Sequence, residues 1–295
     1  MKEVLVTGGG GQLGQALARH DWPGGWQACA LPRAELDLTD PSAIEAAVAS
    51  RRWAAVINAG AYTAVDRAED QPVAAWQANA LGPAALAAAC RAADLPLVHV
   101  STDYVFDGAK DGAWTPDDVP APLGIYGASK LGGELAVRAG TARHAIIRTA
   151  WVVSATGQNF VKTMLQAGAR RPTLRVVADQ RGSPTTAADL AAVLAAIAVR
   201  MVENRDAPTG TWHFANAGAT TWHGFATEIF HQAQMRGGPL PIVEAIATAD
   251  YPTPARRPAN SLLSTATLTR DWAITPRPWQ DALGPILDDL IGAKP

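Results

Sequence analysis

Tyr126 and Lys130, four positions apart, are the strongest candidates for chemistry in this sequence. On a helix, residues at this spacing lie on one face, so the ammonium can approach the phenol and lower its pKa. A tyrosine placed in this way is a general acid for a carbonyl that is being reduced. A tyrosine and a lysine at this spacing, with no other motif nearby, more often mark an exposed helix face. Here it follows a glycine-rich turn and the segment Ser101-Thr102-Asp103, which ends an apolar stretch, and this order favours an active site.

Four consecutive glycines begin at Gly8, and a fifth follows at Gly14. We expect a strand over residues 4–6 and a helix over 12–19. Glycines between a strand and a helix let the backbone approach a pyrophosphate, whose charge is stabilised at the helix N-terminus. One reading starts the motif at Gly9, with the spacing G-x-G-x-x-G, and the other starts at Gly8, with the wider spacing G-x-x-G-x-x-G.

The composition is that of a globular chain with little net charge. Its 295 residues are 48% hydrophobic and 18% charged, enough for a dinucleotide-binding domain and a smaller lobe. A formal net charge of −2 gives no basic footprint for nucleic acid or an anionic membrane. The first strand begins near Met1 and no apolar run reaches 18 residues, so neither a signal peptide nor a membrane span is expected. We expect Cys29 and Cys90 to be reduced packing residues of a cytoplasmic protein.

Strands and helices alternate through the first half of the chain. Repeated units of this length predict an α/β fold with a doubly wound parallel Rossmann sheet. We interpret residues 1–150 as an NAD(P)-binding domain and 151–295 mainly as a smaller α/β substrate-binding lobe, with segments near 174–200 returning to the first domain. The expected strands are 26–31, 54–58, 97–101 and 145–148, and the expected helices are 41–51, 126–139 and an alanine-rich stretch over 73–93 that is broken at Gly82-Pro83.

The pattern is looser in the second half. Residues 158–169 and 187–202 read as helices, with a short strand over 174–177 between them. The segments 210–224 and 240–262 are rich in Gly, Pro and Thr, which favours loops that enclose a ligand. Trp212 and Trp222 are expected to pack the smaller lobe.

The glycine motif, a Ser/Thr after the fourth strand and Tyr-x-x-x-Lys together resemble the extended short-chain dehydrogenase/reductases. This resemblance selects the wider frame, Gly8-x-x-Gly11-x-x-Gly14, and leaves Gly9 and Gly10 as variable positions. Longer pieces, in a match that runs from residue 4 to about residue 285, resemble the dTDP-4-dehydrorhamnose reductases: AYTAVDRAE at 61–69, STDYVF at 101–106, RTAWV at 148–152 and YPTPARRP at 251–258.

The resemblance implies reduction of dTDP-4-dehydro-6-deoxy-L-mannose at C4 to dTDP-L-rhamnose, the last step in making that sugar donor, with NADPH or NADH as the hydride donor. Tyr126 would protonate the developing alkoxide. Lys130 would hold the nicotinamide ribose and support Tyr126, and Thr102 would hydrogen-bond the carbonyl oxygen.

For the cofactor, the resemblance implies contacts with residues that follow each of the first three predicted strands. The second strand ends without the acid that binds a free ribose 2′-hydroxyl and carries Arg33 instead, which favours NADPH. The other implied residues are Gly8, Gly11, Gln12 and Leu13 at the pyrophosphate, Asp37 and Leu38 at the adenine, and Ala61, Tyr62 and Thr63 beside the ribose and nicotinamide.

For the nucleotide-sugar substrate, the resemblance implies Asp103 and Trp151 around the sugar, beside Thr102 and Tyr126. The adjacent Arg256 and Arg257 could clamp the diphosphate, because guanidinium groups bind phosphate oxygens in a fork.

Two other functions fit part of these motifs. Nucleotide-sugar epimerases and dehydratases share the fold, but dehydratases need a further acid where this chain has Tyr104. The regulatory subunit of methionine adenosyltransferase resembles these reductases and serves as a binding partner, yet the complete set of Thr102, Tyr126 and Lys130 favours an enzyme.

The resemblance also bears on metal and assembly. Some members form dimers through a magnesium ion held by carboxylates, and the corresponding positions here are Ala16 and Ala188, which offer no oxygen ligand. Asp189 is next in sequence, but one helical step turns its side chain by about 100°. We therefore expect no metal, and a monomer or a metal-free homodimer.

Overall fold

Six parallel strands form the central sheet of the protein, whose computed structural model describes residues 1–292. The strand order is β10-β5-β4-β3-β1-β2, and every neighbouring pair is parallel. β3 and β5 are buried along their whole length, as expected when helices cover both faces of a parallel sheet. The strands are β1 (Lys2–Thr7), β2 (Trp26–Leu31), β3 (Ala55–Asn58), β4 (Leu97–Thr102), β5 (His144–Thr149) and β10 (Gly210–His213).

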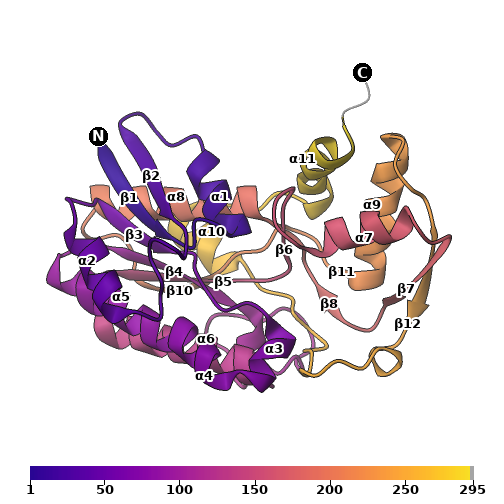
Figure 1. Cartoon of the computed structure of the whole chain (residues 1–295), viewed down its shortest axis with the longest axis horizontal. Coiled ribbons are helices and arrows are strands. Elements are labelled where there is room, and N and C mark those ends of the chain that lie inside the picture. The colour runs from indigo at the N-terminus through magenta and orange to yellow at the C-terminus, as the bar shows by residue number, and fades with distance from the viewer. Residues whose placement is uncertain (293–295) are drawn as a thin grey trace.

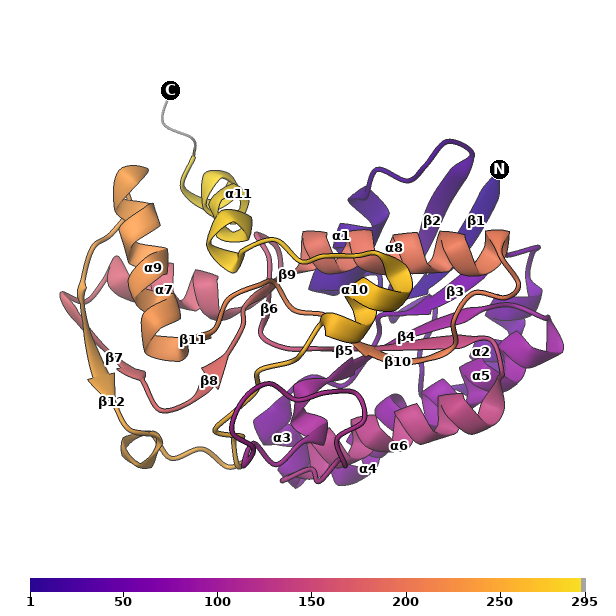
Figure 2. The ribbon, with the colours of Figure 1, turned by 180° about the vertical axis from the view of Figure 1, so that it is seen from behind.

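Helices cover both faces of this sheet, so the predicted doubly wound α/β fold is confirmed (Figures 1 and 2). One face packs against α1 (Gln12–Arg19), α8 (Ala187–Glu203) and α10 (Ala266–Trp272). The other packs against α2 (Pro41–Ala49), α5 (Gly82–Ala92) and α6 (Ile125–Gly140). Within residues 1–292, no helix combines the length and the apolar character needed to cross a membrane.

The strand order determines where a ligand can bind. β2 lies on one side of β1 and β3 on the other, so the loops that leave β1 and β3 diverge to opposite faces. The crevice at such a switch point, outside the carboxyl ends of the strands, is where open α/β sheets bind ligands. The glycine turn follows β1 and therefore lies at this point.

Close backbone contacts fix the glycine turn. Gly8 has φ +71°, and a Cβ there would lie 2.6 Å from the backbone of the loop after β3. A Cβ on Gly14 would lie 2.2 Å from the Gly8 carbonyl oxygen. A Cβ on Gly9 would lie 2.4 Å from a carbonyl oxygen of β2, whereas one on Gly10 would have no neighbour nearer than 3.9 Å. Gly10 is thus open to substitution, but the interpretation of Gly9 as a variable position is wrong, because β2 leaves no room for a side chain.

The alanine-rich helical stretch is not broken at Gly82-Pro83, contrary to expectation. α4 (Pro72–Trp76) leads through a π-helical turn, η1 (Gln77–Leu81), directly into α5, and Gly82 has helical angles of φ −57° and ψ −53°. A proline removes one backbone donor and crowds the preceding turn. The wider π turn accommodates the proline without ending the helix.

The smaller lobe lies beside the carboxyl edge of the sheet (Figure 1). Its helices are α7 (Phe160–Gly168), α9 (Trp222–Met235) and α11 (Trp279–Ile291). Its strands pair in twos: β7 (Thr173–Val177) with β12 (Ile242–Ile246), β6 (Val152–Val153) with β9 (Thr185–Thr186), and β8 (Arg181–Gly182) with β11 (Thr220–Thr221).

The segment that returns from the smaller lobe to the central sheet differs from the predicted range 174–200. β7 pairs with β12 outside the six-stranded sheet, while α8 and β10 belong to the sheet layers. The interpretation of 210–224 as a loop is wrong at its start, where Gly210–His213 forms a strand of the sheet. The predicted loop 240–262 likewise contains a strand, β12. Trp212 lies in the core under α8 and α10 and not in the smaller lobe. The domain boundary near residue 150 stays a prediction.

The contrast between two adjacent glycines gives a test of the turn. Gly9→Ala should lower the free energy of unfolding by about 1–3 kcal/mol, because its Cβ overlaps fixed backbone, and this corresponds to a fall in Tm of several degrees. The matched variant Gly10→Ala should melt within about a degree of the parent protein. Equal Tm values for both variants in thermal unfolding would contradict this packing.

Candidate active site

Tyr126 lies in the first turn of α6, and α3 (Val65–Asp70) holds the start of that helix. The amide of Ile125 donates to Glu69 Oε1 at 2.9 Å, so a carboxylate satisfies one of the free helix N–H groups. The Tyr126 ring meets the ring of Tyr104 edge to face, with centroids 5.4 Å apart. Tyr104 belongs to a single 3₁₀ turn, η2 (Asp103–Val105), that follows β4. These contacts bring Tyr126 to the carboxyl end of β4.

Lys130 is buried one helical turn further along α6. Its side chain is 3% exposed, and Nζ donates to the carbonyl oxygen of Val100 on β4 at 2.7 Å. Burial lowers the pKa of Lys130 to about 8, and the nearby Glu134 carboxylate opposes this shift. The ammonium is thus held against β4 and titrates much closer to neutrality than an exposed lysine does.

Burial raises the pKa of Tyr126 above its ordinary value, and this is the largest effect. A hydrogen bond with Thr102 acts in the opposite direction, while the charge of Asp103 reinforces the increase. The expectation that Lys130 lowers the phenol pKa is therefore wrong for this structure, because the ammonium is bonded to the Val100 carbonyl. A phenol with a raised pKa keeps its proton at neutral pH, and a general acid requires that proton.

Thr102 and Asp103 bring polar atoms to the end of β4. The Thr102 hydroxyl donates to Asp103 Oδ1 at 3.0 Å and accepts from the Tyr104 amide at 3.2 Å. Burial raises the pKa of Asp103 to about 6. Its Oδ2 atom is buried and accepts no hydrogen bond of good geometry within residues 1–292, although the nearby Ser261 hydroxyl helps to lower the pKa of this carboxyl group. An unpartnered buried acceptor is costly, so this oxygen is suited to receive a hydroxyl of a ligand.

The start of α1 fits a pyrophosphate. Gly11 is its N-cap and supplies no side-chain cap, so the first N–H groups of the helix are free for an anion. Leu13 packs into the core, so only its backbone can meet the cofactor. Gln12 Oε1 accepts from Ser154 Oγ and Asn159 Nδ2, each at 2.9 Å, which ties this turn to the smaller lobe.

The residues predicted for the adenine end lie together after β2. Arg33 Nε pairs with Asp37 Oδ2 at 3.1 Å, and the Arg33 side chain is 79% exposed. Hydrogen bonds lower the pKa of Asp37, and the one from the backbone amide of Thr39 has the largest effect. Leu38 is buried and packs against the loop after β3. An exposed guanidinium beside the glycine turn fits a phosphate on the adenosine ribose.

Asn79 positions the loop that contains Ala61, Tyr62 and Thr63. Its Oδ1 accepts from the Tyr62 amide at 2.8 Å, and its Nδ2 donates to the Tyr62 carbonyl at 3.0 Å and to Ser129 Oγ at 3.0 Å. Asn79 lies in the π turn, a feature that often marks functional sites. No motif in the sequence indicates Asn79, although a single amide side chain in an alanine-rich helix is a usable signal.

Trp151 is held in a strained conformation after β5. It has φ +50° and stacks on Trp222 with ring centroids 3.6 Å apart. The Gly182 backbone also packs against the Trp151 ring, where a Cβ would lie 2.5 Å away. Trp222 packs in the smaller lobe as expected, and it also holds the residue that we predicted to contact the sugar.

The two arginines proposed for the diphosphate differ in their surroundings. Arg257 Nη2 pairs with Asp66 Oδ2 at 2.6 Å, and Nη1 lies 3.4 Å from the Tyr104 hydroxyl. Arg256 is exposed. Part of the charge of Arg257 is thus already neutralised by α3, and a clamp formed equally by both arginines stays a prediction.

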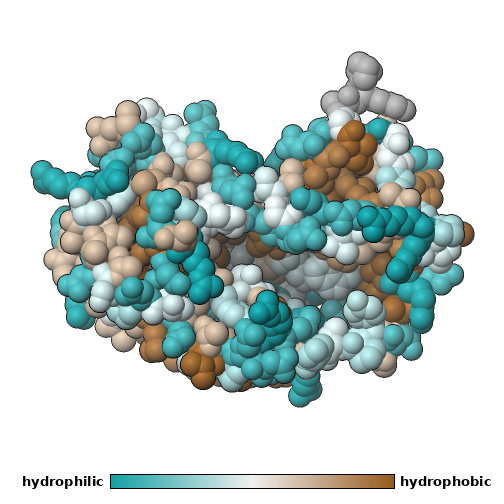
Figure 3. All heavy atoms as spheres, in the orientation of Figure 1, coloured by the Kyte–Doolittle hydropathy of each residue, from teal (hydrophilic) through white to brown (hydrophobic). Residues whose placement is uncertain are grey.

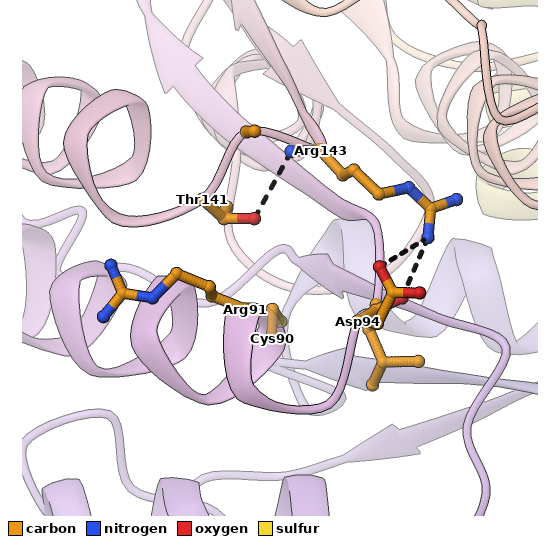
Figure 4. A pocket seen from close by; sticks show the side chains of 7 residues that line it. Cys90, Arg91, Asp94, Thr141 and Arg143 are labelled. Atoms are coloured by element: carbon orange, nitrogen blue, oxygen red, sulfur yellow. Dashed lines mark hydrogen bonds and ion pairs between the residues drawn. The ribbon is translucent and has the colours of Figure 1, made fainter.

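The molecular surface is hollowed between the two lobes, beside the carboxyl edge of the sheet (Figure 3). A small cavity of about 110 Å³, shown in Figure 4, lies beside Cys90, Asp94 and Arg143. These residues border the amino ends of β4 and β5, at the opposite edge of the sheet. This small cavity is therefore separate from the candidate active site.

Comparisons of the sequence and the fold identify the family of this chain. The family described as RmlD substrate binding domain matches residues 1–291. The dTDP-4-dehydrorhamnose reductase of Aggregatibacter actinomycetemcomitans is 41% identical over 96% of this chain and 97% of its own length, and that of Escherichia coli is 38% identical over 98% of both. The crystal structure of dTDP-4-dehydrorhamnose reductase from Bacillus anthracis in complex with NADP has a TM-score of 0.90 and 34% identity, covering 97% of this chain and 99% of that one. The chain belongs to the dTDP-4-dehydrorhamnose reductase family.

Proposed function

We propose that this protein reduces the C4 carbonyl of dTDP-4-dehydro-6-deoxy-L-mannose to give dTDP-L-rhamnose, with NADPH as the cofactor. The observation that carries the proposal is the meeting of Thr102, Tyr126 and Lys130 at the carboxyl end of β4, in a member of this family. The uncapped start of α1 lies at the same edge and fits the cofactor pyrophosphate.

The bound nicotinamide supplies the hydride, and the side chains of this chain supply the proton and the positioning. When the substrate binds, the Thr102 hydroxyl turns from Asp103 Oδ1 and donates to the substrate carbonyl, which polarises the carbonyl for attack. Tyr126, whose pKa is raised by burial, delivers its proton to the oxygen at C4 as negative charge develops there. Lys130 binds the ribose hydroxyls beside Tyr126, and Asp103 Oδ2 accepts a sugar hydroxyl.

Two alternatives are less well supported. A dehydratase needs an acid beside the Thr-Asp pair, and that position holds Tyr104, whose pKa burial raises to about 12. A non-catalytic partner subunit has no need for the buried set of Thr102, Tyr126 and Lys130. We place the protein in the cytoplasm, where its two free cysteines stay reduced.

The proton donor can be removed without disturbing the cofactor site. Tyr126→Phe should lower kcat for NADPH oxidation in the presence of the keto-sugar nucleotide by roughly 10²-fold or more, with the Kd for NADPH nearly unchanged. Tyr251→Phe, the same change at an exposed tyrosine, is the matched control and should keep parent activity. Turnover of Tyr126→Phe near that of the parent would refute this mechanism.

Arg33 tests the cofactor preference. Only NADPH carries a 2′-phosphate, so Arg33→Ala should raise the KM for NADPH by roughly tenfold and leave that for NADH nearly unchanged. Arg52→Ala, at another exposed arginine, should alter neither value. Equal effects of Arg33→Ala on both cofactors would show that Arg33 does not contact the phosphate.

We also propose that activity needs no metal and that assembly is monomeric or a metal-free homodimer. Ala16 and Ala188 line one cavity of about 380 Å³, so the two positions do face a common space, but they present methyl groups to it. Asp189 is already paired with Arg277 at 2.9 Å and accepts from Asn216 at 2.6 Å. Magnesium prefers six oxygen ligands in near-octahedral geometry, which this set does not supply.

Chelation tests this proposal directly. NADPH oxidation should continue at the same rate when EDTA is added. The molecular mass of the protein in solution, which reports whether it is a monomer or a dimer, should not depend on magnesium. Loss of activity in EDTA that magnesium restores would contradict the proposal.

A further inference from the structure

The face of α6 that carries Tyr126 and Lys130 continues four residues further to Glu134. This carboxylate is fully buried, with 0% of its surface exposed. It accepts hydrogen bonds from Ser101 Oγ at 2.6 Å, from Arg148 Nε and Nη2 at 2.8 and 2.7 Å, and from Arg138 Nη2 at 3.0 Å. Three of these four hydrogen bonds come from guanidinium groups, so the carboxylate is fixed in place by charged donors.

Two of the three donor residues come from strands β4 and β5, and Arg138 lies on α6 itself. Ser101 on β4 immediately precedes Thr102, and it lies opposite Arg148 of β5 in the sheet register. Arg148 is 1% exposed, and its guanidinium lies 5.0 Å from the ring centre of Phe106, just after the 3₁₀ turn. Glu134 thus joins α6 to the end of β4 through Ser101, while Lys130 joins the same two elements through the Val100 carbonyl.

The charge of Glu134 also acts on Lys130. Burial lowers the pKa of the lysine to about 8, and Glu134 is the group that raises it. With the carboxylate present, the ammonium stays mostly charged at neutral pH. Without it, burial acts unopposed and the lysine loses its proton at lower pH.

The other ionisable groups around this pair cannot replace the carboxylate. On β4, burial holds the pKa of His99 well below its ordinary value, so it is neutral. On β10, burial lowers the pKa of His213 to about 3, so it too is neutral. Arg148 from β5 and Arg138 from α6 are cations, and Asp103 at the end of β4 is bonded to Thr102.

We propose that Glu134 is a positioning residue for the reduction: it sets the register of α6 against the end of β4 and keeps the Lys130 ammonium charged for cofactor binding. This inference rests on the proposed function, and it adds a residue that neither touches the substrate nor the cofactor.

Glu134→Gln keeps the shape of the side chain and removes its charge. The measurements are the Kd for NADPH by fluorescence titration and kcat/KM for the keto-sugar nucleotide, each from about pH 6 to about pH 10. In the parent, binding and kcat/KM should both weaken as pH rises through the Lys130 pKa near 8. In Glu134→Gln, both midpoints should move to lower pH by about one unit.

A merely structural role would lower activity or Tm without moving these midpoints. Unshifted midpoints in folded Glu134→Gln, or a parent whose NADPH binding does not weaken near pH 8, would overturn the proposal. Arg138→Gln is the control, because it removes an exposed donor to the same carboxylate and leaves the Ser101 and Arg148 bonds in place. Its midpoints should not move to lower pH.

A second variant decides the case if Glu134→Gln does not fold. Ser101→Ala keeps the carboxylate but cuts its bond to β4, so kcat should fall by roughly tenfold while the NADPH-binding midpoint stays at the parent value. Parent-like kcat would overturn the proposal. Because NADPH binding is measured separately, a parent that binds NADPH but does not act on the keto-sugar nucleotide would refute the proposed function alone.

Discussion

The backbone of the glycine turn touches the backbone of its neighbours on three sides, and the arrangement of the site depends on this contact. Gly8 packs on the loop after β3, Gly9 packs on β2, and Gly14 brings the first turn of α1 back onto Gly8. Only residues without a Cβ allow these approaches. The result is a helix N-terminus at the switch point of the sheet, where cofactor, substrate and catalytic residues can meet.

Buried polar residues then align the other elements with this turn. Asn79 joins the loop after β3 to α6 through Ser129, and Glu134 joins α6 to β4 and β5. An unpaired polar group in such an environment costs about 1–3 kcal/mol, so each network favours one arrangement of its members. Because Tyr126 and Lys130 lie on the helix that both networks hold, their position depends on buried residues outside the predicted catalytic set.

Local sequence patterns predict the structure correctly where the feature lies within a single helix or strand. The helix 12–19 and the strand 26–31 have the predicted bounds, and Tyr126 and Lys130 lie on one helix as their spacing required. The errors concern contacts between elements distant in sequence. Nothing near Gly9 shows that β2 packs against it, and nothing near Lys130 shows that the Val100 carbonyl binds the ammonium. The prediction for Trp212 is wrong for the same reason, since β10 pairs with β5 across the sixty residues that lie between these strands.

The path of the chain between the two lobes constrains how this protein could have been assembled in evolution. After β5 the chain enters the smaller lobe, returns as α8 and β10 to complete the sheet, leaves again for α9 and β12, and returns once more as α10 before ending in α11. A gene fusion at a single point near residue 150 would leave the first part without its edge strand and without α8 over one face of the sheet. Exchange of the whole smaller lobe would therefore require cuts at several crossings of the chain and not at one point.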